Sequence, residues 1–238
     1  MNRIVKAGVA AAALACVAPS FAQEAAGEEE LEGAWGWTPV AIGIATPVQL
    51  PWGLNRWDVF GLDVNLFYSD APKMYGIDVG GLAELTRDTA IGLLVGGLAN
   101  VAFENVYGFR ATLGFNYCEK DVYGVDAGLA GFRDTLRGLD VELLGAYQRN
   151  VCGMQVTGLA NVSSVESYGC NVAGLANIAK TAYGLQLALL FNYTQELHGA
   201  QVSLINYTED CPSGFQIGLV NIIMQNRLKF LPIVNGYF

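Results

Sequence analysis

The sequence has few of the residues on which catalytic and nucleic-acid-binding sites most often depend. Its single histidine, His198, is the only one available to a site that pairs a histidine with a serine or cysteine nucleophile. It has 13 lysines and arginines against 22 aspartates and glutamates, and its formal net charge is −9. Nucleic-acid affinity comes largely from basic side chains that neutralise phosphates, so nucleic acid is excluded as the expected partner.

Longer sequence signals are also missing. No phosphate-binding or dinucleotide-binding glycine motif stands between a strand and a helix, which argues against a nucleotide cofactor. Beyond residue 22 there is no run of 18 or more apolar residues, so no conventional membrane-spanning helix is expected. The cysteines beyond that point match no metal-binding spacing, and we expect buried small apolar side chains or at most one disulfide from Cys118, Cys152, Cys170 and Cys211. The sequence therefore predicts no catalytic residue, no cofactor and no metal site.

The residues that are abundant indicate a β-rich protein. Hydrophobic residues make up 53% of the chain, which is enough to build a core, whereas only 15% of the residues are charged. The sequence also contains 29 glycines and 11 tyrosines. Aromatic residues suit strands and glycine marks turns and bulges, so the composition predicts an all-β fold.

The first 22 residues are predicted to be a cleaved signal peptide. Arg3 and Lys6 precede the apolar run AGVAAAALACVA, and Ser20-Phe21-Ala22 resembles a cleavage site before Gln23. A lipid attachment at Cys16 is the alternative, but the leucine lies two residues before this cysteine rather than three. Cleavage removes two basic residues and no acidic one, and 11 − 22 gives a mature charge of −11. The predicted location is the cell surface, outer membrane or periplasm of a Gram-negative bacterium.

The rest of the chain is predicted to have four parts. An acidic linker at 23–35 is followed by an extended, proline-punctuated capping segment at 36–57, a repeat array at 58–225 and a C-terminal cap strand at 226–238. Glycines 14 to 16 residues apart mark the repeat, and no long loop interrupts it, so one domain is expected. These column glycines are Gly61, Gly76, Gly92, Gly108, Gly124, Gly138, Gly153, Gly169, Gly184, Gly199 and Gly214.

The residues that follow each column glycine alternate in polarity. The first and third are apolar in all eleven repeats, and the second is polar in ten, with Leu94 as the exception. This period of two predicts a strand with one buried face. An asparagine recurs seven or eight residues after the glycine, as in Asn177 and Asn192, and is interpreted as a recurrent turn. An aromatic residue often precedes the glycine, as Tyr183 does, which indicates a second short strand.

Two architectures fit this repeat. One is a β-solenoid of about eleven coils of 15–16 residues, in which equivalent residues stack. The other is an outer-membrane antiparallel β-barrel of about 12 strands, which the aromatic ending Tyr237-Phe238 would suit. Successive turns of a barrel lie on opposite sides of the membrane and differ, whereas every repeat here has the same turn signature. The repeat therefore favours the solenoid.

Stacked coils would place acidic residues over one another. Asp63 would lie over Asp78 and Asp126 over Asp140, and such pairs raise pKa values, bind cations or resemble the acids of a glycosidase. We interpret them instead as part of a solvated outer face. His198 occupies the column that tyrosine fills elsewhere, so it is predicted to continue that column rather than to act as a base. Outward tyrosines beside glutamine and asparagine columns would suit contact with a glycan or a protein.

Several repeats resemble a known bacterial family. The segments NVCGMQVTGLANVSS, SYGCNVAGLANIAK, AYGLQLALLFNYT and SGFQIGLVNI, with ATPVQLPW at 45–52 and the ending FLPIVNGYF, are similar to the G-L-Q-L-G-L-V-N units of spirochaete-type surface repeat-containing proteins. The resemblance covers about residues 38–238. It implies an exported, envelope-associated protein without assigned catalysis, and it brings no binding residues. The early repeats depart from the pattern because they have aspartate where it has glutamine.

These observations predict a non-enzymatic protein of the cell envelope or surface. It would act as a structural or interaction module, either adhesive or scaffolding, with a surface protein or a glycan as ligand and an association with the outer membrane. An outer-membrane β-barrel channel is the alternative function. A polysaccharide-active enzyme that uses the acidic pairs is a more remote one.

Overall fold

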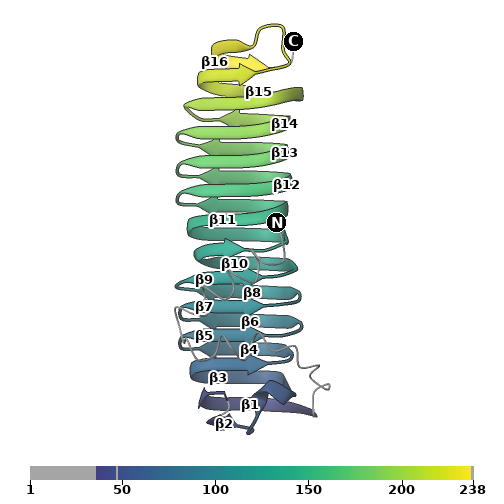
Figure 1. Ribbon diagram of the computed structural model, residues 1–238, viewed down its shortest axis with the longest axis vertical. Coiled ribbons are helices and arrows are strands. Elements are labelled where there is room, and N and C mark those ends of the chain that lie inside the picture. The colour runs from purple at the N-terminus through teal and green to yellow at the C-terminus, as the bar shows by residue number, and fades with distance from the viewer. Residues whose placement is uncertain (1–35, 47, 237–238) are drawn as a thin grey trace. The chain divides into compact units, whose positions relative to one another are not determined.

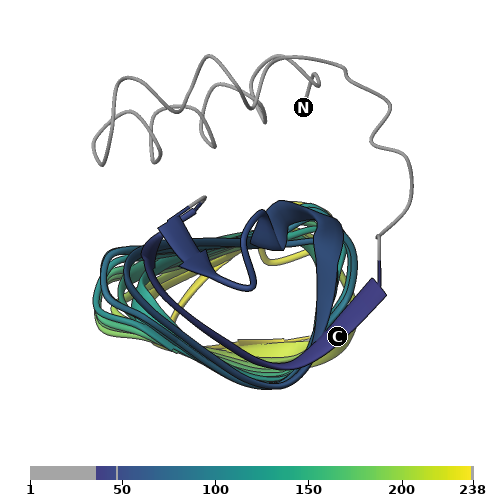
Figure 2. The ribbon, with the colours of Figure 1, turned by 90° about the horizontal axis from the view of Figure 1, so that it is seen from below.

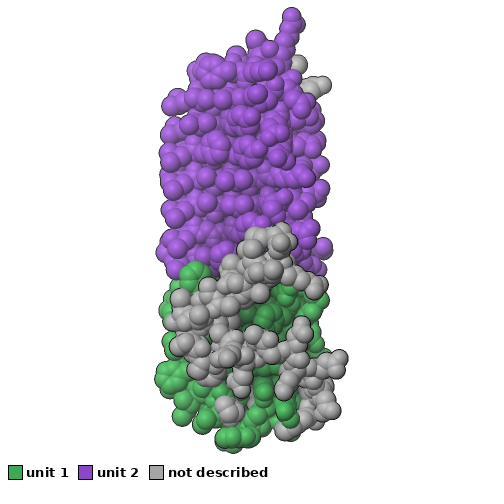
Figure 3. Space-filling model, viewed as in Figure 1, with its two compact units in different colours: residues 1–120 green, residues 121–238 purple. Residues whose placement is uncertain are grey.

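The computed structural model of the chain describes residues 36–46 and 48–236, and these residues form strands with a single short 3-10 turn. They divide into two compact units, with the boundary between Lys120 and Asp121, which Figure 3 shows in different colours. The predicted signal peptide, the acidic linker and the aromatic ending at 237–238 lie outside the described residues. No helix in the described residues is long and apolar enough to cross a membrane.

Unit 1 contains the first nine strands. Their bounds are β1 Gly36–Ala45, β2 Val48–Leu50, β3 Trp57–Ala71, β4 Met74–Gly80, β5 Ala83–Thr86, β6 Ala90–Gly96, β7 Ala99–Ala102, β8 Val106–Thr112 and β9 Phe115–Cys118, with the 3-10 turn at Leu54–Arg56. Two stacks of parallel strands begin at the long strand β3. One has the order β3-β4-β6-β8 and the other the order β3-β5-β7-β9. Each coil of this unit therefore contributes one strand to each of two walls (Figure 1).

Unit 2 contains longer strands that run through the corners of the coils. Their bounds are β10 Asp121–Phe132, β11 Thr135–Thr157, β12 Ala160–Ala173, β13 Ala176–Ala188, β14 Phe191–Val202, β15 Ile205–Ile223 and β16 Phe230–Gly236. Consecutive strands from β10 to β15 are neighbours in the sheet. Figure 2 shows the coils end-on, with successive coils of this unit overlying one another.

The pairing of the coils is parallel and in register. In unit 2, Gly169 pairs with Gly184 and Gly184 with Gly199, and in unit 1 Gly61 pairs with Gly76. Equivalent residues of successive repeats are thus neighbours along the coil axis, as predicted. Parallel stacking within each unit confirms the β-solenoid, and the antiparallel β-barrel was the wrong alternative, because a barrel wall would need neighbouring repeats to pair as hairpins.

Each unit has one antiparallel strand at an edge of its stack, β2 in unit 1 and β16 in unit 2. Strand β1 pairs in parallel with β3 and in antiparallel with β2, whereas β16 pairs in antiparallel with β15. An unpaired parallel edge is a template for further strands. Strand β2 covers part of the edge of β1 in unit 1, and β16 covers part of the edge of β15 in unit 2.

The column glycines are required by the close approach of successive coils. At Gly184 the backbone has a φ of 120°, and a Cβ atom would lie 2.2 Å from the carbonyl oxygen of Gly169. At Gly199 the φ is 146°, and the Cβ would lie 2.0 Å from the carbonyl oxygen of Gly184. Both the backbone conformation and the space exclude a side chain. This explains why glycine marks the period of the sequence.

The strand that follows each column glycine faces the opposite way from our expectation. The residue two positions after the glycine is polar and buried, as at Asp126 and Gln201, whereas the apolar residues one and three positions after it point outward, as at Phe215 and Ile217. The asparagines lie inside strands, and the bends come two or three residues before them, for example at 174–175 before Asn177. The interpretation of asparagine as a turn residue was therefore wrong, because its side chain is needed inside the coil.

Candidate functional site

An asparagine ladder runs through the interior of unit 2. Each Nδ2 donates to the Oδ1 of the next asparagine, at 2.9, 3.0, 3.0 and 2.8 Å, along the series Asn161, Asn177, Asn192, Asn206 and Asn221. Each Nδ2 also donates to a backbone carbonyl, such as that of Leu187 for Asn177 at 2.7 Å. An amide carries both a donor and an acceptor, so one asparagine can bond to an identical one in the next coil. The ladder fastens successive coils together.

A glutamine ladder lies parallel to it in the last coils. Gln216 Nε2 donates to Gln201 Oε1 at 2.8 Å, and Gln201 Nε2 donates to Gln186 Oε1 at the same distance. Thr194 supports the ladder, because its hydroxyl donates to Gln186 Oε1 at 2.9 Å and accepts from Gln201 Nε2 at 2.6 Å. The interior of these coils is uncharged and hydrogen-bonded. A smaller apolar cluster of Ala179, Ala182, Leu197, Cys211 and Ile223 fills the space that remains.

The interior of unit 1 contains carboxylates at equivalent places. Asp63 accepts bonds from Asn65 Nδ2 at 2.5 Å and Ser69 Oγ at 2.6 Å, and burial raises its pKa to about 6. Glu84 accepts bonds from the amide of Gly80 and from Asn100 Nδ2, both at 2.5 Å, yet burial raises its pKa to about 8.

Asp78, whose Cα pairs with that of Asp63, belongs to the same coil as Glu84, because β4 and β5 both pair with β3. Its pKa is raised well above the usual value, first by burial and then by the charges of Glu84 and Asp63. A carboxyl whose pKa is about 8, as that of Glu84 is, keeps its proton at neutral pH.

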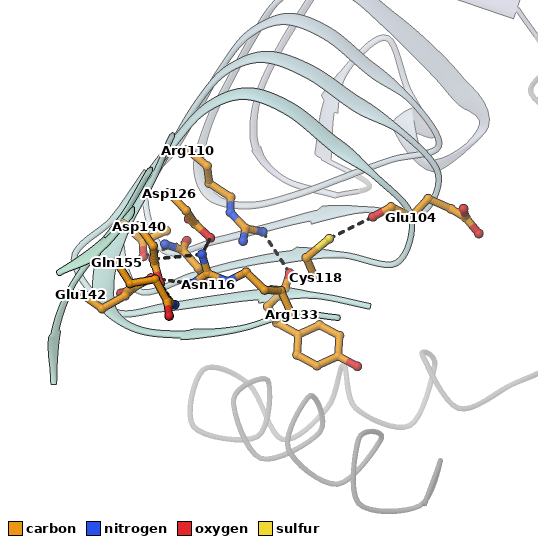
Figure 4. Close-up of polar contacts among 11 residues, drawn as sticks. Glu104, Arg110, Asn116, Cys118, Asp126, Arg133, Asp140, Glu142 and Gln155 are labelled. Atoms are coloured by element: carbon orange, nitrogen blue, oxygen red, sulfur yellow. Dashed lines mark hydrogen bonds and ion pairs between the residues drawn. The ribbon is translucent and has the colours of Figure 1, made fainter. Parts of the chain in front are cut away.

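A charged cluster lies inside the first coils of unit 2 (Figure 4). Arg133 Nη1 lies 2.8 Å from Asp126 Oδ2 and 2.9 Å from Asp140 Oδ1, and its Nη2 lies 3.0 Å from Glu142 Oε1. All four side chains are fully buried. Burial by itself lowers the pKa of Arg133, but the three carboxylates raise it above its usual value. We call this group the Arg133 cluster.

Local sequence explains how the guanidinium reaches this place. Arg133 follows β10, and a Cβ atom at Gly131 would lie 1.6 Å from Arg133 Nη2, so only glycine leaves room for the guanidinium. Gln155 Nε2 completes the cluster by donating to Asp140 Oδ2 at 3.2 Å. Burial raises the pKa of Asp140, and Arg133 acts in the opposite direction. Oxygens of the three carboxylates lie within 4.8 Å of one another, as metal ligands would, but the guanidinium is the cation among them.

The predicted acidic pairs are therefore correctly paired but wrongly placed. Asp63 pairs with Asp78 and Asp126 with Asp140, as the stacking of repeats requires. They do not lie on a solvated outer face, since all four are buried inside the coils. Glu84 and Glu142, which the sequence analysis did not single out, belong to the same interior. The repeat alignment could have identified Glu84, because Glu84 occupies the position of the asparagine column and pairs with Asn100 of the next coil.

The aromatic column before the glycines is an outer stack. The rings of Tyr168 and Tyr183 lie 4.5 Å apart with their planes 2° from parallel, and Tyr183 and His198 are 4.6 Å apart at 6°. His198 thus continues the tyrosine column, as predicted. Its Nδ1 lies 3.1 Å from Ser213 Oγ and its Nε2 lies 2.9 Å from Glu196 Oε1. Stacked rings cover each other's faces, so only ring edges remain for a glycan or protein.

The chain matches no family model, no curated protein and no solved structure. The resemblance to surface-repeat proteins stays a prediction from the sequence. The cysteines offer no further site, because the four in the described part of the chain form no disulfide with one another, and burial raises the pKa of Cys211 to about 11.

An apolar outer face runs along the coils of unit 2. Between each column glycine and the residue after the asparagine column, every outward side chain in the described coils of this unit is uncharged. The charged residues of that span, Asp126, Asp140 and Glu142, are all buried. The outward charged side chains of the coils lie between the asparagine column and the next glycine, at Asp121, Asp134, Arg137, Arg149, Glu166, Lys180, Glu196, Glu209 and Asp210.

Proposed function

We propose that the chain is a non-enzymatic, exported module of the bacterial cell envelope, which acts as a scaffold or adhesive surface. The observation that carries this proposal is the segregation of the coil exterior into a long apolar face and a charged side. Monomeric proteins seldom expose a large continuous apolar surface unless it contacts a partner. In a solenoid, the same contact chemistry is repeated along the axis, which suits an extended docking surface.

The buried position of the carboxylates favours this function over a polysaccharide-active enzyme. General acid and base groups must lie within hydrogen-bond reach of the substrate. Asp63, Asp126 and Asp140 have no exposed surface, and their oxygens bond to neighbouring side chains inside the coil. The β-barrel channel also loses its structural basis, because neighbouring coils pair in parallel within each unit.

Fractionation of a Gram-negative host that expresses the whole chain tests the proposal. We expect the protein in the envelope fraction or the medium, with Gln23 as its first residue and with protease sites accessible on intact cells. Leu14→Arg should keep it in the cytoplasm, whereas Ala25→Arg, beyond the predicted cleavage site, should not. Recovery of the unaltered chain in the cytoplasm would refute the proposal. Turnover of surface glycans that Asp126→Asn abolishes would favour the enzyme instead.

A further inference from the structure

Within strands β10 to β15 and the bends between them, the most exposed apolar residues gather along one corner of the coils. Leu143, Leu189 and Leu219 are 67%, 70% and 68% exposed. Backbone bonds connect the neighbouring positions from coil to coil, from Leu159 to Leu144, Leu175 to Leu159, Leu190 to Leu175 and Ile205 to Leu190. We call the two adjoining rows the leucine ridge, and its members are Leu143, Leu144, Leu159, Leu175, Leu189, Leu190, Leu204, Ile205 and Leu219.

The ridge is a convex feature rather than a groove. The chain bends at 158–159, 174–175, 189–190 and 203–204, where one strand wall of the coil meets the next. Side chains at an outward bend diverge from one another, so a rigid partner would need a matching concave surface. A second copy of this ridge would also be convex and would bury little area against it. A fluid hydrocarbon layer fits a convex ridge without such complementarity.

Charge and aromatic residues are arranged around the ridge as they are in interfacial membrane proteins. The outward charges of the coils lie on the other side, beyond the asparagine column. Between the ridge and these charges lies a row with Tyr193 and Tyr207, whose rings are 5.5 Å apart. The hydroxyl of Tyr193 donates to Glu209 Oε1 at 2.9 Å. An aromatic ring with one polar end is suited to the boundary between hydrocarbon and water.

We infer that unit 2 docks on the surface of a phospholipid bilayer through the leucine ridge, with the coil axis along the membrane plane. The inference rests on the proposed envelope function and names the partner of its apolar face. Six coils at about 4.8 Å each give a ridge about 29 Å long, and interfacial elements insert about 5–10 Å into the headgroup and acyl boundary. The exported chain, whose charge is 11 − 22 = −11, offers no attraction to anionic lipids, so apolar contact drives the binding.

Flotation of the exported chain, residues 23–238, with lipid vesicles tests this inference. We expect it to float with vesicles of pure phosphatidylcholine, in low and in high salt alike. Replacement of about 25% of the lipid by the anionic phosphatidylglycerol should not strengthen binding, because the protein is acidic. Failure to bind neutral vesicles, or binding that needs anionic lipid and disappears in salt, would overturn the inference.

Two matched triple variants locate the contact. Leu159→Asn, Leu175→Asn and Leu190→Asn alter the ridge, and we expect vesicle binding to fall by about tenfold or more. Ser164→Asn, Lys180→Asn and Gln195→Asn alter exposed positions on the charged side of the same coils, and binding should stay unchanged. Circular dichroism verifies that both variants fold, and single substitutions at the three ridge positions replace the triple variant if it does not. Equal binding by the two folded variants would contradict the assignment of the ridge.

The outcomes separate this inference from the envelope function. An exported protein that fails to bind vesicles but cross-links to an envelope protein would retain the proposed function and lose the lipid contact. A dimer in solution that the ridge substitutions abolish, without any vesicle binding, would show that a second copy covers the ridge and would equally overturn the inference. Cytoplasmic retention would defeat the envelope function itself, whatever the vesicles show.

Discussion

The interiors of the two units use the same positions for different chemistry. Two residues after the column glycine, unit 1 has Asp63 and Asp78, whereas the last coils of unit 2 have Gln186 and Gln201. The glutamines bond to each other directly, because an amide is both donor and acceptor. An ionised carboxylate only accepts, so Asp63 depends on Asn65 and Ser69 for its donors. Amides can be stacked on copies of themselves, whereas carboxylates need a different neighbour.

The Arg133 cluster shows the other solution to a carboxylate stack. There, one guanidinium contacts three buried carboxylates and supplies the donors that they lack. In unit 1, the raised pKa values of Asp63, Asp78 and Glu84 indicate protonation as a further solution. The three arrangements of the interior should therefore respond differently to mutation and to pH.

Arg133→Met is expected to have the largest effect. It leaves three carboxylates buried without a cation, and breaking a buried ion pair in this way costs about 3–5 kcal/mol. The free energy of unfolding of unit 2, measured by urea titration with hydrogen exchange, should fall by this amount. Arg149→Met removes an exposed arginine of the same unit and should have little effect. Addition of Asp126→Asn, Asp140→Asn and Glu142→Gln to Arg133→Met should restore much of the stability, and absence of rescue would refute the explanation.

Gln201→Glu should make the amide region behave like the acidic one. Burial is expected to raise the pKa of the new carboxyl above its unfolded value of about 4.3, so its stability cost is absent at low pH and appears as pH rises. We expect a loss of about 2–4 kcal/mol at pH 8 and less than about 1 kcal/mol at pH 4, from urea unfolding at both values. Gln195→Glu, on the exposed side of the same unit, is the control. A cost that is independent of pH would contradict this account.

Asp78→Asn is the reverse change in unit 1. The raised pKa values of Asp78, of Asp63 at about 6 and of Glu84 at about 8 mean that the folded state holds protons which the unfolded chain releases above about pH 4. Wild-type unit 1 should therefore lose stability as pH rises from about 4 to about 8.

The Asp78→Asn variant should be as stable as the wild type near pH 4. At pH 8 its free energy of unfolding should be higher by about 1–3 kcal/mol, because the neutral amide needs no proton. Hydrogen exchange in peptides from β3 and β4, corrected for the intrinsic rate, measures the difference. Asp88→Asn, at an exposed position of the same unit, should not change the pH dependence. A variant less stable than the wild type at pH 8 would refute the prediction.

The smallest expected effects are equal in the two units. Phe60 and Tyr75 stack at 4.6 Å in unit 1, much as Tyr168 and Tyr183 do at 4.5 Å in unit 2. Tyr75→Leu and Tyr168→Leu should each cost about 0.5–1.5 kcal/mol, since each removes one aromatic stack on the outside of the coil. Urea midpoints measured at one pH test this. A cost that differs severalfold between the units would mean that the aromatic stacks do not contribute equally to the stability of the two units.

The period, the parallel stacking and the membership of each column could be predicted from the sequence. They depend on local repetition, and the glycine column records it because the approach of one coil to the next excludes a side chain there. The stacking of His198 on Tyr183 and the pairing of Asp63 with Asp78 follow from the same alignment.

The direction in which each column faces could not be predicted by the usual rule. Alternation shows that two sets of side chains face opposite sides, but the rule that apolar residues face inward gave the wrong side. A signal was present four residues after the glycine, where unit 2 has Thr157, Ala173 and Ser203. Such small residues indicate a narrow interior, in which amide stacks fit and bulky leucines do not. The Arg133 cluster was missed because its arginine stands outside the repeated pattern.

The asparagine and glutamine ladders make the later coils interchangeable. Every coil from Gly153 onward offers an asparagine of the asparagine ladder to its neighbours, so duplication or deletion of one whole coil of 15 or 16 residues leaves each Nδ2 of that ladder opposite an Oδ1. A single inserted residue would instead turn inward side chains outward. The chain can therefore change its length during evolution in steps of about 4.8 Å, and with it the number of contact sites it presents. Coils that hold a carboxylate lack this freedom, since each must keep its own partner, and growth is confined to the amide region.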